Sequence, residues 1–235
     1  MEPETLHYRD GDLRLTAQLW CPGGPPRAAI AVYPTIANST AAVEAKAAAL
    51  AEAGFAAMVA DFYGDSADDA PDYMALAKPL RQDATLFRNR IRPALGILAD
   101  TVPGVPMAAI GFCLGGQAVL ELARDGADLV LAASFHGLLT THAPAEPDAI
   151  KARLLVCHGD ADPMVPRDQV IAFWEEMDQA GADWHFHSYA GVKHGFTNPD
   201  SPPGYDAVAY DASADRQSWA ALMSMLDEVL ATEAD

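Results

Sequence analysis

The sequence predicts an α/β fold with a mostly parallel central sheet and helices on both faces. Two observations carry this prediction. Short apolar runs alternate with helical segments along most of the chain, and 51% of the 235 residues are hydrophobic, which is enough for a large core. The alternation favours parallel pairing, because parallel strands need a crossover that is usually helical. We expect one domain over residues 1–235.

The expected elements follow in chain order. Residues 6–20 form two mixed runs around Asp10-Gly11, a pair that favours positive φ and therefore predicts a hairpin at the sheet edge. Pro93 is expected to kink or divide the helix in which it lies. Buried strands are predicted at about 28–33, 55–60, 107–110, 129–135, 154–158 and 184–189, and helices at about 40–53, 80–99, 117–124, 168–180 and 213–230.

The charge balance limits the classes of partner. The chain has 33 acidic and 15 basic residues, and its net charge of -18 argues against nucleic acid or an anionic membrane, because the protein would repel phosphate. No stretch approaches the run of about 20 apolar residues that a membrane-spanning helix needs. We interpret the charge as a solvated surface, and we expect a small-molecule substrate and a monomer or homodimer.

The N-terminal residues and the cysteines indicate in which cellular compartment the protein is expected. Residues 1–4 are acidic and are not followed by an apolar core, so no secretory signal is predicted. The three cysteines, Cys21, Cys113 and Cys157, are odd in number and far apart, which does not suggest a disulfide framework. We therefore expect a cytoplasmic protein.

One short stretch carries the strongest chemical signal. An apolar strand runs into Gly111-Phe112-Cys113-Leu114-Gly115 and then into a helix, a pattern typical of a nucleophile elbow. The glycines allow strand and helix to approach closely, and the N–H of Leu114 at the helix N-terminus would stabilise a thiolate or an oxyanion. The alternative is a Gly-rich turn around a cysteine that serves as a small buried hydrophobe.

A histidine and a carboxylate complete this pattern. A thiol with a pKa of about 8.5 needs a base or a positive neighbour to react at neutral pH. His194 follows the last predicted strand and Asp162 follows the strand before it, so Cys113, Asp162 and His194 occur in the chain order of α/β-hydrolases. Asp160 is a rival for the carboxylate, and we favour Asp162.

The other histidines allow two interpretations each. His136 ends a strand beside the elbow, and it is either a pocket wall or a core histidine with satisfied hydrogen bonds. His185 and His187 share one face of a strand, but no third ligand is evident, so we predict a strand surface and no metal site. No cofactor is expected.

Three motifs resemble the dienelactone hydrolase family: GFCLGG at 111–116, GDADPMVP at 159–166 and HGF at 194–196. The resemblance covers nearly the whole chain and implies an α/β-hydrolase fold and a carboxylic ester hydrolase. It also implies Cys113 as nucleophile, His194 as base and Asp162 as the acid that orients it. The implied oxyanion hole uses the N–H groups of Leu114 and Thr35. The residues expected to line the substrate pocket are Pro34, Ile36, Tyr63, His136 and Phe196.

The chain also departs from that family. Members that act on dienelactone carry a glutamate in the first loop, where this chain has Pro34, and hold the substrate carboxylate with arginines that are missing after Tyr63 and after His194. We therefore expect a neutral ester or lactone. The long segment 190–211, rich in Pro, Gly and Asp, is expected to form a rim or lid over the pocket.

Two other functions stay open. One is an impaired hydrolase scaffold that binds a small ligand in the same pocket, because fold alone does not establish catalysis. The other is a redox-sensing thiol at Cys113, although no Cys-x-x-Cys motif supports it.

Overall fold

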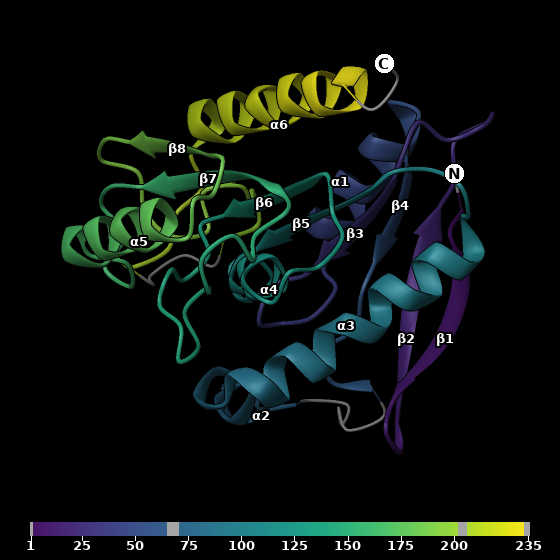
Figure 1. Cartoon of the computed structure of the whole chain (residues 1–235), viewed down its shortest axis with the longest axis horizontal. Coiled ribbons are helices and arrows are strands. Elements are labelled where there is room, and N and C mark those ends of the chain that lie inside the picture. Colours follow the sequence, from purple (N-terminus) through teal and green to yellow (C-terminus); the bar gives the residue numbers. More distant parts are fainter. Residues whose placement is uncertain (1, 65–70, 202–205, 233–235) are drawn as a thin grey trace.

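The computed structural model describes residues 2–64, 71–201 and 206–232, and within these residues one eight-stranded sheet lies between layers of helices (Figure 1). The strand order across the sheet is β1-β2-β4-β3-β5-β6-β7-β8. The strands are β1 Glu4–Asp10, β2 Leu13–Trp20, β3 Ala29–Tyr33, β4 Ala56–Val59, β5 Met107–Phe112, β6 Leu131–Phe135, β7 Arg153–Gly159 and β8 Trp184–Tyr189.

The pairing confirms a mostly parallel sheet. Strands β4, β3, β5, β6, β7 and β8 pair in parallel, whereas β1 and β2 form the expected antiparallel hairpin, and β2 joins β4 antiparallel. Asp10 pairs with Leu13 across the hairpin turn, where Gly11 has a φ of 56°. The carboxyl ends of the six parallel strands therefore meet at one edge, where a site is expected in such a sheet.

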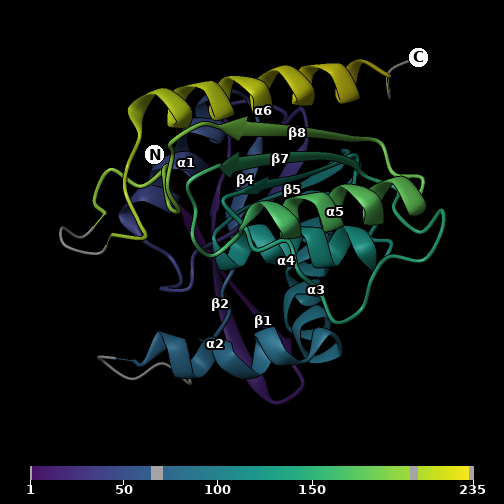
Figure 2. The same cartoon turned by 90° about the vertical axis from the view of Figure 1, so that its left-hand side faces the viewer.

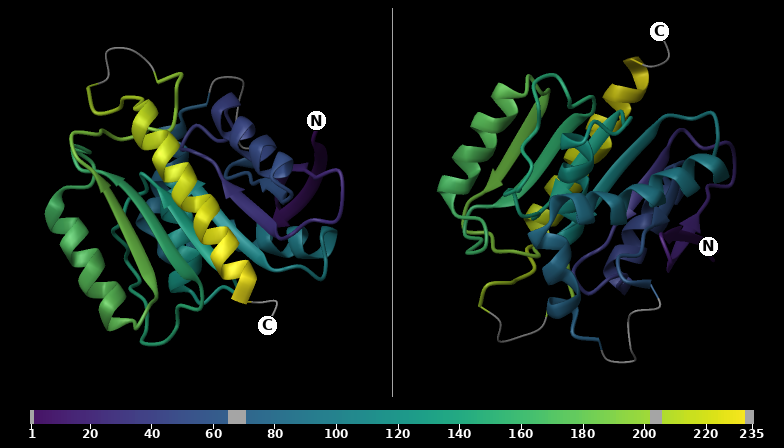
Figure 3. Two further views of the ribbon diagram at one scale, coloured as in Figure 1. Left: turned by 90° about the horizontal axis from the view of Figure 1, so that it is seen from above. Right: turned by 60° about the horizontal axis from the view of Figure 1, so that its bottom comes forward.

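Helices cover both faces of the sheet (Figures 1, 2 and 3). On one face, α1 (Ala41–Glu52) and α6 (Ala212–Thr232) bury Val43, Leu50 and Leu226 against the sheet. The other face carries α3 (Ala84–Thr101), α4 (Leu114–Arg124) and α5 (Arg167–Gln179), with Phe173 of α5 in its core. None of the helices in the described ranges is long and apolar enough to cross a bilayer.

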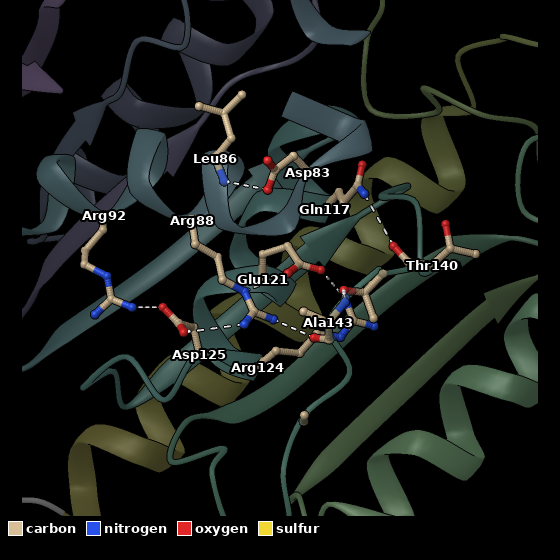
Figure 4. A network of polar contacts seen from close by, with 12 residues as sticks. Asp83, Leu86, Arg88, Arg92, Gln117, Glu121, Arg124, Asp125, Thr140 and Ala143 are labelled. Carbon is tan, nitrogen blue, oxygen red and sulfur yellow. Dashed lines mark hydrogen bonds and ion pairs between the residues drawn. The ribbon is translucent and has the colours of Figure 1, made fainter. Parts of the chain in front are cut away.

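The region around the predicted helix 80–99 differs from expectation. It contains two helices, α2 (Tyr73–Gln82) and α3, and the break lies at Asp83 rather than at Pro93, which lies inside α3. Asp83 has an extended backbone, and its carboxylate accepts a hydrogen bond of 3.0 Å from the N–H of Leu86 (Figure 4). A side-chain cap of this kind starts a new helix at Asp83.

A buried ionic network joins three helices. The Arg124 side chain in α4 is only 1% exposed and donates to the carboxylates of Glu121, at 3.1 Å, and of Glu176 in α5, at 2.8 Å. Arg88 of α3 donates to the second oxygen of Glu121 and to the carbonyl of Ala143 (Figure 4). Each buried charge thus has an opposite partner, as burial requires.

We expect Arg124→Met to lower the free energy of unfolding by about 3 kcal/mol, because Glu121 and Glu176 would each lose a buried arginine partner and Glu121 would keep only Arg88. Urea denaturation followed by circular dichroism measures the change. The matched control is Arg167→Met, which removes an arginine that is 79% exposed and paired with Asp160, and should leave the midpoint nearly unchanged. Equal midpoint shifts in the two variants would contradict the importance of the buried network.

Candidate active site

Cys113 lies on a strained turn between β5 and α4. Its φ of 55° and ψ of -113° are unfavourable for a residue with a side chain. A Cβ added to Gly111 would overlap the Gly115 carbonyl oxygen, and one added to Gly115 would overlap the carbonyl oxygen of Tyr33. Only glycines permit this approach, so the local sequence builds the sharp strand-to-helix turn expected of a nucleophile elbow.

Asp162 and His194 lie together at the carboxyl ends of β7 and β8. The Nδ1 atom of His194 is 2.6 Å from Oδ2 of Asp162, and both residues are buried. The other carboxylate oxygen of Asp162 accepts the N–H of Met164 at 2.8 Å, which fixes the carboxylate. Asp160, the rival carboxylate, instead binds Arg167 through two hydrogen bonds of 2.9 and 2.7 Å.

Cys113 and His194 line the same cavity and influence each other's protonation. Burial alone would lower the pKa of His194, but its interactions with Asp162 and Cys113 outweigh burial and raise that pKa to about 10. Burial would likewise raise the pKa of the Cys113 thiol, yet His194 and two backbone N–H groups lower it below its ordinary value. Because Nδ1 is bound to Asp162, the interaction with Cys113 falls to Nε2, and that nitrogen has no other partner among the residues that the structure describes. It is therefore available to a substrate or to the thiol.

The two backbone N–H groups that lower the pKa of the Cys113 thiol belong to Leu114 and Ile36. Leu114 is the first residue of α4, and Ile36 follows β3. The sequence predicted Leu114 together with Thr35; Thr35 borders the first cavity, while the N–H that lowers the pKa of the thiol belongs to its neighbour Ile36. These N–H groups converge where a negative charge on sulfur, or on an oxygen next to it, would be stabilised.

His136 satisfies both of its ring nitrogens and also borders the cavity. Its Nδ1 accepts the N–H of Cys113 at 3.1 Å, and its Nε2 lies 2.9 Å from the hydroxyl of Thr197. Burial and the neighbouring His194 hold the pKa of His136 well below its usual value. A neutral ring that accepts at Nδ1 carries its proton on Nε2, so His136 holds the backbone of Cys113 in place. His136 is therefore both a pocket wall and a buried histidine with satisfied hydrogen bonds.

Two cavities meet at the sulfur. The first, about 160 Å³, lies beside α1 and includes Lys46, whose ammonium is 2.6 Å from the Asp215 carboxylate. The second, about 370 Å³, lies beside α2 and includes Met74, with the exposed Arg81 on its wall. The lining residues that the two cavities share are Ile36, Cys113, His194 and Val208.

The predicted pocket residues divide into two groups. Ile36 and His136 line the cavities, whereas Tyr63 and Phe196 are fully buried and support the wall from behind. The hydroxyl of Tyr63 donates to the Ile36 carbonyl at 2.9 Å, and the ring of Phe196 packs edge-on against His136. Pro34 is also buried, and its carbonyl lies close to Gly115.

Four lining residues were not predicted from the sequence: Met164, which lies in the motif at 159–166, and Lys46, Met74 and Arg81, which reach the cavities from helices without a chemical motif. No local signal marks the three helical residues, because only the docking of α1 and α2 brings them to the site.

Part of the predicted rim packs against the site. The N–H of Ala209 donates to the His194 carbonyl at 3.1 Å, and Asp211 binds the Phe196 carbonyl in the same way. Val208, which directly precedes Ala209, borders both cavities. Residues 202–205 of the segment lie outside the described residues, and its movement as a lid stays a prediction.

Comparison with known proteins identifies relatives over most of the chain. The model of the dienelactone hydrolase family matches residues 15–230. The solved structure of a dienelactone hydrolase-like promiscuous phosphotriesterase, P91, from metagenomic libraries is 33% identical, with a TM-score of 0.88 over 97% of this chain and 98% of that one.

Two curated relatives are similar over shorter stretches. An uncharacterized protein of Caenorhabditis elegans is 38% identical over 167 residues, which are 63% of this chain and 99% of the relative. A Bradyrhizobium protein named "Probable 2-oxo-3-(5-oxofuran-2-ylidene)propanoate lactonase" is 27% identical over 72% of this chain and 73% of its own.

The pKa directions at Cys113 and His194 predict the reactivity of the thiol. The iodoacetamide alkylation rate of Cys113 should reach half its maximum below the ordinary thiol pKa of about 8.5. In His194→Gln the midpoint should move above it, because burial remains while the positive neighbour is lost. Peptide mass spectrometry measures each cysteine separately, and Cys157, whose pKa burial raises to about 12, is the internal control. An unchanged midpoint in His194→Gln would show that the imidazole does not activate the thiol.

Proposed function

The chain belongs to the dienelactone hydrolase family and is therefore a hydrolase with the α/β-hydrolase fold; from this premise we propose that it cleaves a small ester or lactone with a Cys113–His194–Asp162 triad. The observation that carries the proposal is the 2.6 Å contact between Asp162 and His194 beside a strained Cys113, with the cysteine and histidine in one cavity. A nucleophile, a base and an orienting carboxylate are the groups that acyl transfer needs.

The charges of the site support a preformed ion pair. The lowered pKa of Cys113 and the raised pKa of His194, about 10, both favour transfer of the thiol proton to His194, which would leave a thiolate beside an imidazolium. Asp162 stabilises the imidazolium through Nδ1. This arrangement activates the thiol without the glutamate that members acting on dienelactone carry in the first loop.

The reaction follows from these positions. The Cys113 thiolate attacks the carbonyl carbon, and the resulting oxyanion accepts hydrogen bonds from the N–H groups of Ile36, in place of the predicted Thr35, and Leu114. The bond between the carbonyl carbon and the alkoxide oxygen then breaks, and His194 gives its proton to the departing alkoxide. The acyl group stays on Cys113 as a thioester. Water loses a proton to His194 and attacks the thioester, and the sulfur leaves as the thiolate with its imidazolium partner restored.

The first cavity, on one side of the Cys113 sulfur, favours a neutral part of the substrate. Lys46 is compensated by Asp215 and also lies 4.7 Å over the Trp219 ring, so the first cavity offers hydrogen-bonding groups without an uncompensated cation. The second cavity is mainly apolar, but Arg81 lies on its wall and could accept an anionic substituent at that end.

The chemistry is tested with a short-chain p-nitrophenyl ester. We expect a burst of nitrophenol equal to the enzyme concentration and a mass increase of one acyl group on Cys113, because acylation precedes slower hydrolysis of the thioester. Cys113→Ala should abolish the burst, and Asp162→Asn should slow it strongly while the fold is retained. The matched control is Asp160→Asn, which should keep the burst. An unmodified Cys113 in the wild type would favour a scaffold that binds a ligand without catalysis.

Substrate charge is tested with a matched panel. We expect a higher kcat/KM for neutral p-nitrophenyl esters than for esters with a carboxylate in the acyl group, because the protein carries a net charge of -18. Diethyl p-nitrophenyl phosphate belongs in the panel, because the relative P91 is named a phosphotriesterase. We expect slow nitrophenol release from it that disappears in Cys113→Ala. A preference for the carboxylate esters that Arg81→Gln removes would overturn the neutral assignment.

A further inference from the structure

The N–H of Ile36 is aimed by a tight turn. The carbonyl of Thr35 accepts the N–H of Asn38 at 3.0 Å, and Asn38 has a left-handed φ of 62°. The Thr35 carbonyl and the Ile36 N–H belong to one planar peptide unit and point in opposite directions. Holding the carbonyl toward Asn38 therefore directs the N–H to the opposite side, where Ile36 and Cys113 border the same two cavities and where this N–H lowers the pKa of the thiol.

The next peptide unit is held by Tyr63. Its hydroxyl donates a hydrogen bond of 2.9 Å to the carbonyl of Ile36. Tyr63 is 2% exposed, and burial raises its pKa well above the ordinary value, so the hydroxyl keeps its proton and remains a donor. Both peptide units next to the Ile36 Cα are thus fixed, one by Asn38 and the other by Tyr63.

Asp61, after the end of β4, locks Tyr63 and Asn38 together. One carboxylate oxygen accepts the side-chain amide of Asn38 and the N–H of Tyr63, each at 2.9 Å. The other accepts the N–H of Thr16 at 3.0 Å. The Asn38 amide oxygen in turn accepts the N–H of Phe62 at 3.2 Å. Two loops that follow neighbouring strands, β3 and β4, therefore hold each other in one arrangement.

We propose that Tyr63 is a positioning residue for the oxyanion hole, and that its hydroxyl keeps the N–H of Ile36 aimed at Cys113. The hydroxyl does not touch the reacting atoms, but without it the peptide between Ile36 and Ala37 loses its buried partner. Rotation about the Ile36 backbone would then weaken a donor that must be in place before the oxyanion forms. The kinetic part of this inference rests on the proposed acyl transfer, whereas the effect on the thiol does not.

The direct test is Tyr63→Phe, which removes only the hydroxyl. We expect the burst rate constant with a p-nitrophenyl ester to fall about 10- to 100-fold, somewhat less than for complete loss of an oxyanion donor. The KM should change little, because Tyr63 lies behind the wall of the cavity. The burst amplitude should stay at one per enzyme, because the nucleophile remains.

Titration of Cys113 supplies a readout that needs no substrate. Thiolate absorbance near 240 nm, measured against Cys113→Ala, should show a higher thiol pKa in Tyr63→Phe, since the N–H of Ile36 helps to stabilise the thiolate. If the wild type shows no burst but this pKa shift occurs, the proposed hydrolase function fails and the positioning role of Tyr63 stands.

The matched control is Tyr33→Phe. The Tyr33 hydroxyl is also buried and donates to a backbone carbonyl, that of Ile91, at 2.7 Å, but this bond lies in the core against α3. Tyr33→Phe should lower the melting temperature as much as Tyr63→Phe does, while leaving the burst rate and the thiol pKa unchanged.

A second variant, Asn38→Gly, keeps the left-handed turn accessible and removes the side-chain amide. It should slow the burst and raise the thiol pKa, as Tyr63→Phe does. Agreement between the two variants would show that neither effect comes from a folding defect in one of them. The proposal would be overturned if folded Tyr63→Phe kept the burst rate and the thiol pKa of the wild type. It would also be overturned if Tyr33→Phe lost as much burst rate as Tyr63→Phe.

Discussion

The close approach of α4 to the strands below it is the constraint on which the site depends. Gly111 and Gly115 leave no room for a Cβ, and this contact forces Cys113 into a backbone conformation that costs on the order of 1–3 kcal/mol. The burial of α4 against the sheet offsets that cost, because every residue from Leu114 to Arg124 is buried. In return, the sulfur, the first N–H of the helix and the loop after β3 converge on one point.

Around that point, neighbouring titratable groups hold different charges. His194 is stabilised as a cation by Asp162 and by Cys113, whereas His136, with its ring centroid 5.1 Å from that of His194, is kept neutral by burial and by the same positive charge. The distinction matters because only a neutral His136 can accept the N–H of Cys113. Burial thus separates two histidines into an ionised group and a structural acceptor.

The sequence was sufficient for those parts of the fold and site that depend on short-range patterns. The hairpin, the parallel sheet and the turn at Cys113 follow from residue types within a few positions, and the chain order placed Asp162 and His194 after the correct strands. Other features depend on longer-range geometry. The choice between the N–H groups of Thr35 and Ile36 depends on how the turn to Asn38 closes, and the position of Arg81 depends on the packing of a whole helix.

The two cavities have few walls in common. Four residues border both, among them the cysteine and the histidine, while α1 contributes to one side and α2 to the other. Substitutions on one helix can therefore reshape the space for one half of a substrate without disturbing the other half or the reactive groups. Such separation makes the scaffold readily adaptable, since each side of the cleavable bond can diverge independently during evolution or in directed selection.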